Sequence, residues 1–407
     1  MGLRATPASS SGSGNDAGSL PEAVVAGHLS LDLYPAVHGP VKLEPGRLVL
    51  VGPPVVSTGG AVANTGLALH RLGVGVRLIA KVGADLFGRA VLESLAAHGQ
   101  HLAEEIAVSA EEATSYTIVI SPPGVDRSFL HCPGANRTFS AQDVPYERLA
   151  GVRLFHFGYP PLMPQMYADG GSQLRAMFAR VHRAGAATAL DLCEPDPESE
   201  AGQVDWREVL SRALPFVDVF APSVDELLFM FDRPAHERLR AGAPLASVVD
   251  HSLLGKLAAL LTGMGAAVVA IKLGDQGLYL RTTHEDARME SFCKRIGLDA
   301  GAWGDRELLS PCFAPRAVRG TTGSGDATIA GLLAALLRGA GPGQAATVAT
   351  AVGACSVEAT DPISGVPDWT SLVRRLADRW QRLPVDIALA RDAKVARDPS
   401  GAMILRP

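Results

Sequence analysis

The sequence has 407 residues, of which 47% are hydrophobic and 19% are charged, and its formal net charge is -5. This composition supplies enough apolar material for a sizeable core and excludes a chain that is disordered throughout. The slightly acidic charge lacks the basic footprint that nucleic-acid binding needs, so we expect no nucleic-acid partner.

The N-terminal segment 1–20 is rich in serine and glycine, carries a single arginine and has no apolar stretch of the kind that a signal peptide needs. We expect it to be a disordered tail. No apolar run approaches the roughly 18 residues that a membrane helix requires, so we expect no membrane partner. The five cysteines are widely spaced and form no Cys-x-x-Cys pair, which argues against a disulfide framework or a zinc site. A cytoplasmic protein is the resulting expectation.

Predicted strands and helices alternate along residues 21–380, which we expect to form one domain. The strands are expected at 23–27, 76–82, 154–157, 187–192, 217–221 and 268–273, and the helices at 61–72, 88–98, 172–184 and 329–337. Because crossover helices join parallel strands, this alternation predicts an α/β fold in which a mostly parallel sheet carries helices on both faces.

Two segments interrupt the alternation and are expected to form a small β-sheet lid over one edge of the domain. Residues 31–57 are β-rich, with short runs at 48–51 and 55–56 broken by glycine and proline. Residues 117–121 and 127–130 flank a turn at 122–126 and predict a β-hairpin. The lid would therefore come from about 31–57 and 113–135. Residues 281–311 and the C-terminal extension 381–407 show no clear periodicity, and no function is assigned to either.

The sharpest chemical signal is a loop of small residues that runs into a helix. Gly323, Ser324 and Gly325 lie just before a helical pattern of apolar residues. Such a loop exposes backbone N–H groups at the positive end of a helix dipole, where phosphate oxygens can approach closely. The loop has neither the Gly-Lys-Ser/Thr of a Walker A motif nor the Gly-x-Gly-x-x-Gly of dinucleotide binding.

Asp326 adds a carboxylate to this predicted anion site. A carboxylate would repel phosphate, so its presence indicates that it meets a hydroxyl proton while a phosphoryl group is transferred. The helix end should lower its pKa, but in phosphoryl transfer the base need only align the hydroxyl and take the proton late. The alternative is that Asp326 only favours the helix dipole and that the glycines form a tight turn.

Two segments in collinear order make the chain resemble the ribokinase-like, or PfkB, family of carbohydrate kinases, from about residue 24 to 371. Residues 321–326 resemble the C-terminal signature Asp-Thr-x-Gly-Ala-Gly-Asp, and residues 59–68 resemble the N-terminal signature Gly-Gly-x-x-x-Asn-x-Ala. The resemblance implies a ribokinase-like fold with a β-sheet lid. It also implies an ATP- and Mg2+-dependent phosphotransferase that acts on a hydroxyl of a sugar or sugar-like small molecule.

The resemblance further implies roles for individual residues. Asp326 would be the catalytic base, and the anion hole would be lined by Gly323, Ser324 and Gly325. The acceptor's hydroxyls would be held by Asp32, Gly59, Gly60 and Asn64. ATP would be bordered by Lys272, Gly274, Gly277 and Thr322, and Glu226 would organise Mg2+ through water.

Each assignment has a structural alternative. Asn64 could serve only as a helix-end hydrogen bonder, Asp32 as a turn residue and Gly59 with Gly60 as a tight corner. Glu226 could be a solvated helix carboxylate.

The sequence also departs from the family pattern. Gly320 replaces an aspartate linked in the family to a monovalent-cation site, and Ser223 replaces the asparagine of an Asn-x-x-Glu motif. Thr350 and Cys193 also stand where asparagine is common. Two other functions therefore stay open, a nucleoside kinase of the same fold and a catalytically weakened regulatory member that only binds a ligand. Family members often dimerise through lid edges, so the resemblance leaves a homodimer open, while the sequence does not establish the oligomeric state.

Overall fold

The computed structural model describes residues 22–39, 41, 44–122, 128–389 and 394–406. The predicted tail at 1–20 and most of the predicted hairpin turn lie outside these residues. Seven parallel strands form one side of the main sheet, in the spatial order β5 (Ile106–Ser109), β4 (Val76–Gly83), β1 (Ala23–Gly27), β8 (Leu154–Gly158), β9 (Ala187–Leu190), β10 (Val219–Phe220) and β11 (Val268–Lys272). Antiparallel strands continue it as β12 (Leu278–Thr282), β13 (Glu307–Ser310), β15 (Met403–Arg406) and β14 (Lys394–Arg397).

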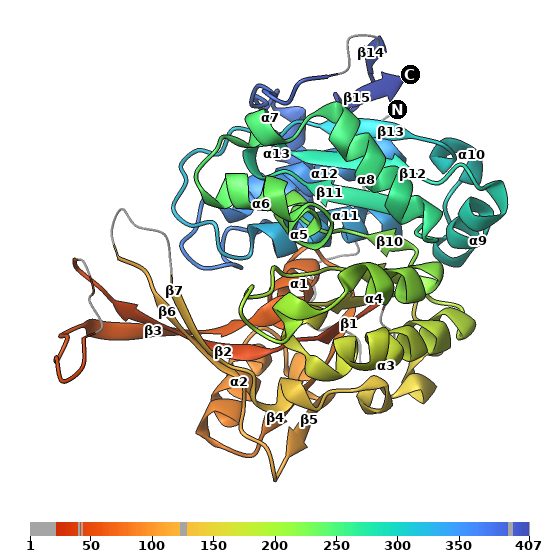
Figure 1. The fold of residues 1–407 in the computed structure, drawn as a ribbon. Coiled ribbons are helices and arrows are strands. Elements are labelled where there is room, and N and C mark those ends of the chain that lie inside the picture. Colours follow the sequence, from red (N-terminus) through yellow and green to blue (C-terminus); the bar gives the residue numbers. More distant parts are fainter. Residues whose placement is uncertain (1–21, 40, 42–43, 123–127, 390–393, 407) are drawn as a thin grey trace.

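Helices cover both faces of this sheet, so its central strands are apolar on both sides (Figure 1). Strand β1 shows the consequence, because Ala23 and Val25 belong to one core while Val24 and Ala26 belong to the other. The first core includes residues of α1 (Gly60–Arg71), α9 (Asp286–Ile296), α11 (Ser324–Leu337) and α12 (Pro342–Ser356). The second includes residues of α3 (Pro164–Arg183), α4 (Trp206–Ala213), α5 (Val224–Phe231) and α8 (His251–Gly263). The predicted α/β class with a mostly parallel sheet is confirmed.

Further α-helices complete the domain. They are α2 (Leu86–Ala96), α6 (Arg233–Arg240), α7 (Leu245–Val248), α10 (Ala300–Trp303) and α13 (Trp369–Ala377). Among the described helices, none is long and apolar enough to cross a membrane.

A separate four-stranded sheet, the lid, extends outward from the body (Figure 1). Its strands follow the order β3 (Gly52–Gly59), β2 (Ser30–Ala36), β6 (Tyr116–Ile120) and β7 (Ser128–Cys132). Strands β6 and β7 form the predicted hairpin. The strand expected at 48–51 is wrong: these residues precede β3 without pairing, and Leu50 is 88% exposed. Pro53 and Pro54 are tolerated within β3 because it is an edge strand.

The two segments without periodicity both have regular structure. Residues 281–311 contain the end of β12, then α9, α10 and β13. The C-terminal extension supplies β14 and β15, and β15 pairs with β13 so that Leu309 lies opposite Met403. The extension therefore adds two strands to the edge of the main sheet.

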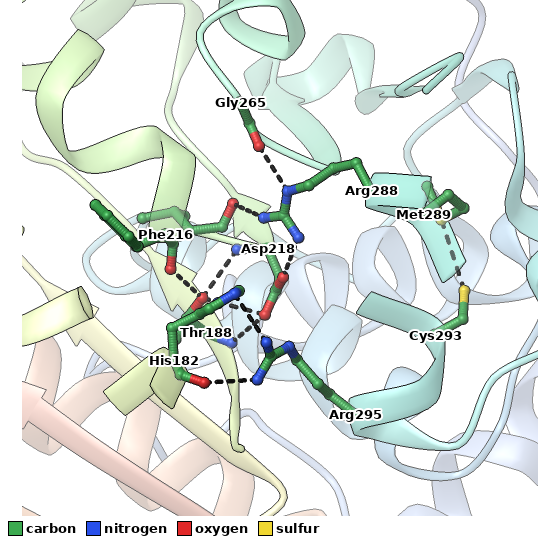
Figure 2. Close-up of polar contacts among 10 residues, drawn as sticks. His182, Thr188, Phe216, Asp218, Gly265, Arg288, Met289, Cys293 and Arg295 are labelled. Atoms are coloured by element: carbon green, nitrogen blue, oxygen red, sulfur yellow. Dashed lines mark hydrogen bonds and ion pairs between the residues drawn. The ribbon is translucent and has the colours of Figure 1, made fainter. Parts of the chain in front are cut away.

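Helix α9 carries one half of a buried ion pair that ties the amino ends of the strands together (Figure 2). The Arg288 guanidinium donates to the Asp218 carboxylate at 2.6 Å and to the carbonyls of Val217 and Gly265, each at 2.8 Å. The other Asp218 oxygen accepts from the backbone N–H of Thr188 at 2.8 Å. Because Asp218 is fully buried, these donors replace the water that its charge would otherwise need.

Substitution of Asp218 by asparagine is expected to lower the free energy of unfolding by about 3–5 kcal/mol, because it leaves the Arg288 charge buried without a counterion. Urea denaturation followed by circular dichroism measures this loss.

The matched control is Glu208→Gln, which removes an ion pair with Arg212 whose side chains are 48% and 46% exposed. An exposed pair contributes only about 0–1 kcal/mol. Equal effects of the two substitutions would contradict a structural role for the buried pair.

Candidate active site

The predicted anion loop leads directly into helix α11, which begins at Ser324 and so contains Ser324, Gly325 and Asp326 in its first turn. Gly323 precedes the helix in a left-handed conformation with a φ of 73°. A Cβ at Gly323 would lie 2.4 Å from the Cβ of Pro362, so the position admits only glycine. No side-chain hydrogen bond caps this end of the helix, although the Ser324 N–H donates to the carbonyl of Thr321 at 3.2 Å. N–H groups at the start of a helix are the groups that an anion can approach.

Asp326 is buried at this helix end and receives three side-chain hydrogen bonds. Asn64 and Thr65 of helix α1 donate to its two carboxylate oxygens at 3.0 and 3.2 Å. The hydroxyl of Tyr159 donates to Oδ2 at 2.8 Å. Burial raises the pKa of Asp326 above its usual value, and the hydrogen bonds from Tyr159, Asn64 and Thr65, together with the charge of Lys272, act in the opposite direction. The carboxylate is thus more basic than an exposed aspartate and is held in one orientation.

Asp32 approaches the start of α1 from the lid strand β2, and two glycines make room for this approach. A Cβ at Gly59 would lie 2.1 Å from Asp32 Oδ2, and one at Gly60 would lie 2.5 Å from the carbonyl oxygen of His28. The hydroxyl of Ser30 donates to Asp32 at 2.9 Å. Burial raises the pKa of Asp32, although its hydrogen bonds oppose the shift. The tight corner at Gly59 and Gly60 therefore also admits a carboxylate to the site.

A cavity of about 960 Å³ lies between the lid and the body, and we call it the acceptor cavity. The predicted residues that line it are Asp32, Gly60, Asn64, Thr322 and Gly323. Tyr159 lines it as well, so one wall carries the hydroxyl that donates to Asp326. The cavity thereby joins predicted acceptor-binding residues from the lid and α1 to the loop before α11.

A second polar cluster lies at the ends of β9 and β11. Lys272 Nζ donates to Asp191 Oδ1 at 2.6 Å, and a Cβ at Gly325 would lie 3.7 Å from the same Nζ. Burial alone would lower the pKa of Lys272, but the Asp191 and Glu226 carboxylates raise it. Burial raises the pKa of Asp191 above its usual range, although Lys272 opposes the shift. A protonated lysine therefore lies beside the first turn of α11.

Glu226 forms a capping box with Ser223 at the start of α5. Ser223 N donates to Glu226 Oε2 at 2.7 Å, while Glu226 N donates to Ser223 Oγ at 3.2 Å. Glu226 is only 8% exposed, so the alternative of a solvated helix carboxylate is wrong. Burial raises its pKa, and the nearby Lys272 charge opposes this. The serine that replaces the family's asparagine thus caps this helix.

Gly274 is the first residue of the short helical turn η8 (Gly274–Gln276), which follows β11, and Gly277 is the residue after it. Both have positive φ values, 59° and 101°. A Cβ at Gly277 would lie 2.1 Å from the carbonyl oxygen of Ser310, so packing against β13 explains that glycine. A Cβ at Gly274 would meet open space. Neither glycine lines the acceptor cavity.

Sequence reasoning missed Tyr159, Asp191 and His28, although one signal could have found them. Each directly follows a parallel strand, namely β8, β9 and β1. Binding residues collect at the carboxyl ends of parallel strands in open α/β sheets. Tyr159 also has a left-handed backbone, with a φ of 66°, which is rare for a bulky residue and common at functional sites.

Comparison with known families gives a match to the model described as "pfkB family carbohydrate kinase" over residues 20–369. A relative from Archaeoglobus fulgidus named "Uncharacterized sugar kinase" is 23% identical over 74% of this chain and 98% of its own length. A relative from Methanothermobacter thermautotrophicus named "Nucleoside kinase" is 25% identical over 79% of this chain and 85% of its own length.

Among solved structures, Arabidopsis thaliana ribokinase complexed with ribose and ATP has a TM-score of 0.66 to this chain. It is 18% identical, and the match covers 88% of this chain and 98% of the ribokinase. At this identity the likeness concerns the fold, which is thereby identified as ribokinase-like.

The Tyr159 hydroxyl stabilises the charged carboxylate of Asp326 and so lowers its pKa. Replacement of Tyr159 by phenylalanine removes this donor and is therefore expected to raise the pKa of Asp326. The midpoint of the Asp326 titration should therefore move to higher pH. Carbon-13 NMR of aspartate side-chain carboxyls follows the titration, and the Asp326 signal is assigned by its absence in Asp326→Asn.

Tyr146→Phe serves as the control, since the Tyr146 hydroxyl donates to the carbonyl of Ala141 and not to Asp326. A shift of the Asp326 titration in the control, or none in Tyr159→Phe, would rule out the direct effect.

Proposed function

The chain belongs to the pfkB family of carbohydrate kinases, and we propose that it transfers the γ-phosphoryl group of ATP to a hydroxyl of a sugar or sugar-like small molecule. The observation that carries this proposal is the position of Asp326. Its carboxylate is buried in the first turn of α11, beside the acceptor cavity and next to helix N–H groups that can receive phosphate. A base beside an anion site is the arrangement that phosphoryl transfer to a hydroxyl requires.

In the proposed reaction, the acceptor's hydroxyl oxygen bonds to the γ-phosphorus as the bond from that phosphorus to the bridging oxygen of ADP breaks. Asp326 receives the hydroxyl proton, and the products are ADP and a phosphate monoester. The donors Asn64, Thr65 and Tyr159 hold the carboxylate in place, so little reorganisation is needed when the acceptor binds. The raised pKa of Asp326 suits a group that must accept a proton.

Charge on the transferring group would be stabilised by the first turn of α11. Gly323, Ser324 and Gly325 carry little or no side chain, so their backbone can approach phosphate oxygens closely. The buried Lys272 ammonium beside Gly325 would add a positive charge.

ATP would lie across the turn at Gly274 and the loop at Thr322, with Gly277 shaping that turn. Open space around Gly274 fits the close approach of a nucleotide. Bound Mg2+ would neutralise part of the phosphate charge during transfer. Among the described residues, no three His, Cys, Asp or Glu side chains form a direct metal site. This fits an ion held mainly by phosphates and water, with the buried Glu226 acting through water.

A nucleoside kinase is the second candidate, and aromatic residues of the cavity favour it. Tyr34, Phe129 and Tyr167 line the acceptor cavity, where a nucleobase could stack. A weakened regulatory member is less well supported. A Cβ built on the altered position Gly320 would lie 3.0 Å from the carbonyl oxygen of Ala359. Asp326, in contrast, keeps all three of its side-chain hydrogen-bond donors.

The decisive experiment measures ADP release with Mg-ATP across ketoses, aldoses, sugar acids and nucleosides, with Asp326→Asn alongside. Loss of the base should lower turnover by about 10²–10⁴-fold and change ATP affinity little. Turnover by Asp326→Asn close to that of the wild type would contradict the assignment of Asp326 as the base. Absence of ADP release with every acceptor, despite ATP binding, would favour the regulatory alternative.

We also propose that the protein is cytoplasmic and that it forms a homodimer through the lid. All five cysteines are free, as expected in a reducing compartment. The lid, including the connection between its strands β2 and β3, exposes several large apolar side chains, namely Leu48, Leu50, Val51, Val55, Val56, Phe129 and Leu130. Such a concentration on a sheet with two open edges favours burial against a second copy.

The double substitution Leu50→Lys and Val55→Lys is expected to shift the protein from dimer to monomer in sedimentation velocity, because it places charges on the proposed interface. Leu86→Lys is the control, an equally apolar and exposed position on α2 (67% exposed) outside the lid. A monomeric wild-type protein at micromolar concentration would refute the dimer.

A further inference from the structure

The acceptor cavity contains a buried histidine that the proposed chemistry does not use. His28 follows β1, is 2% exposed and lines the cavity. Neither Nδ1 nor Nε2 has a hydrogen-bond partner among the described residues. Buried polar groups in folded proteins are nearly always hydrogen-bonded, so an unpartnered imidazole on a cavity wall points to a ligand group.

A second histidine faces His28 from the lid. The ring centroids of His28 and His131 are 5.3 Å apart, and His131 belongs to strand β7. The Nδ1 atom of His131 hydrogen-bonds with Thr117 Oγ1 at 3.0 Å, while Nε2 has no partner among the described residues. Asn64 lines the cavity beside Asp326, and its Oδ1 atom also has no hydrogen-bond partner among the described residues. Three residues that line one cavity, from the body and the lid, thus contain four buried nitrogen and oxygen atoms without a partner among the described residues.

These atoms suit hydroxyl groups. Burial lowers the pKa of both His28 and His131, which favours the neutral rings. Neutral His28 offers one donor and one acceptor, whereas His131 offers only Nε2, because its Nδ1 bonds to Thr117. A hydroxyl group can donate and accept, so it satisfies either tautomer of each ring, and it can also donate to Asn64 Oδ1. A carboxylate or phosphate only accepts, so it would leave the acceptor atoms unpaired.

The charges around the cavity also disfavour an anion as the acceptor. Its walls carry the carboxylates of Asp32, Glu194, Asp196 and Glu200. Among the described residues that line it, the only cations of the Lys and Arg type are Arg137 and Arg240, and both are exposed. An acidic group held near His28 and Asp32 would be buried beside a like charge without a cation.

We propose that the acceptor is a neutral polyhydroxy compound and that His28 is a specificity-determining residue that binds one of its hydroxyls, with His131 approaching from the lid. This inference rests on the proposed function in that it describes the acceptor of the same site. It concerns recognition, and so it can be tested without phosphoryl transfer.

The test is calorimetric titration of the full-length protein with matched pairs of neutral and acidic compounds. D-glucose with D-glucuronate and D-galactose with D-galacturonate differ only at one carbon, and D-ribose, D-fructose and myo-inositol extend the neutral set. The variants are His28→Leu, which removes both nitrogens, and His28→Asn, which keeps one polar group near the place of Nδ1. Thermal unfolding by circular dichroism verifies that each variant is folded.

The wild-type protein should bind at least one neutral compound, and its acidic counterpart at least tenfold more weakly. His28→Leu should lower the affinity for the neutral compound by about 10- to 100-fold, as expected when a hydrogen bond to a buried group is lost. His28→Asn should lower this affinity less. His101→Leu is the matched control, because His101 pairs with His70 at 5.6 Å outside the cavity, and it should bind like the wild type.

Tighter binding of a sugar acid than of its neutral partner would overturn the proposal. So would unchanged affinity in a folded His28→Leu or, if that variant does not fold, in His28→Asn. Binding of a neutral compound without ADP release would contradict the proposed kinase function and leave this inference intact. ADP release with acidic acceptors alone would support the proposed kinase function and contradict this inference.

Discussion

The site depends on the burial of one carboxylate where two distant helices meet. Asn64 and Thr65 of α1 donate to Asp326 of α11, and these helices pack against the same face of the sheet. A buried charge is tolerated only where donors surround it, so the two signature segments must come together for either to be stable. The same contacts orient the proposed base. Packing and chemistry therefore impose a single requirement on this part of the fold.

The amino and carboxyl ends of the parallel strands have different roles. Tyr159, Asp191 and Lys272 lie at the carboxyl ends, where ligands bind in open α/β sheets. The ion pair between Asp218 and Arg288 lies at the amino ends, where its donors lock strands and α9 together. At the carboxyl ends, by contrast, the buried nitrogen atoms of His28 have no partner among the described residues.

The sequence predicted what local periodicity and small-residue motifs encode. The parallel strands, helix α1 and the loop before Asp326 follow from such patterns. Contacts between distant segments could not be predicted in this way: the hydroxyl of Tyr159 reaches Asp326 across 167 positions in the chain. The four-residue strand β15 is too short to show periodicity and exists because β13 offers it an edge. The buried state of Glu226 likewise depends on neighbours that no local pattern reveals.

The pairing of β15 with β13 affects which strand edge is exposed during synthesis and in shortened chains. Strand β13 contributes backbone groups to a sheet that is extended by residues translated long after it. During synthesis, or in any shortened chain that lacks 403–406, the outer side of β13 presents unpaired N–H and C=O groups. Such an edge is a template for association with other chains. The C-terminal strands therefore cover this edge of β13, and the four-residue strand β14 becomes the outer edge of the sheet in its place.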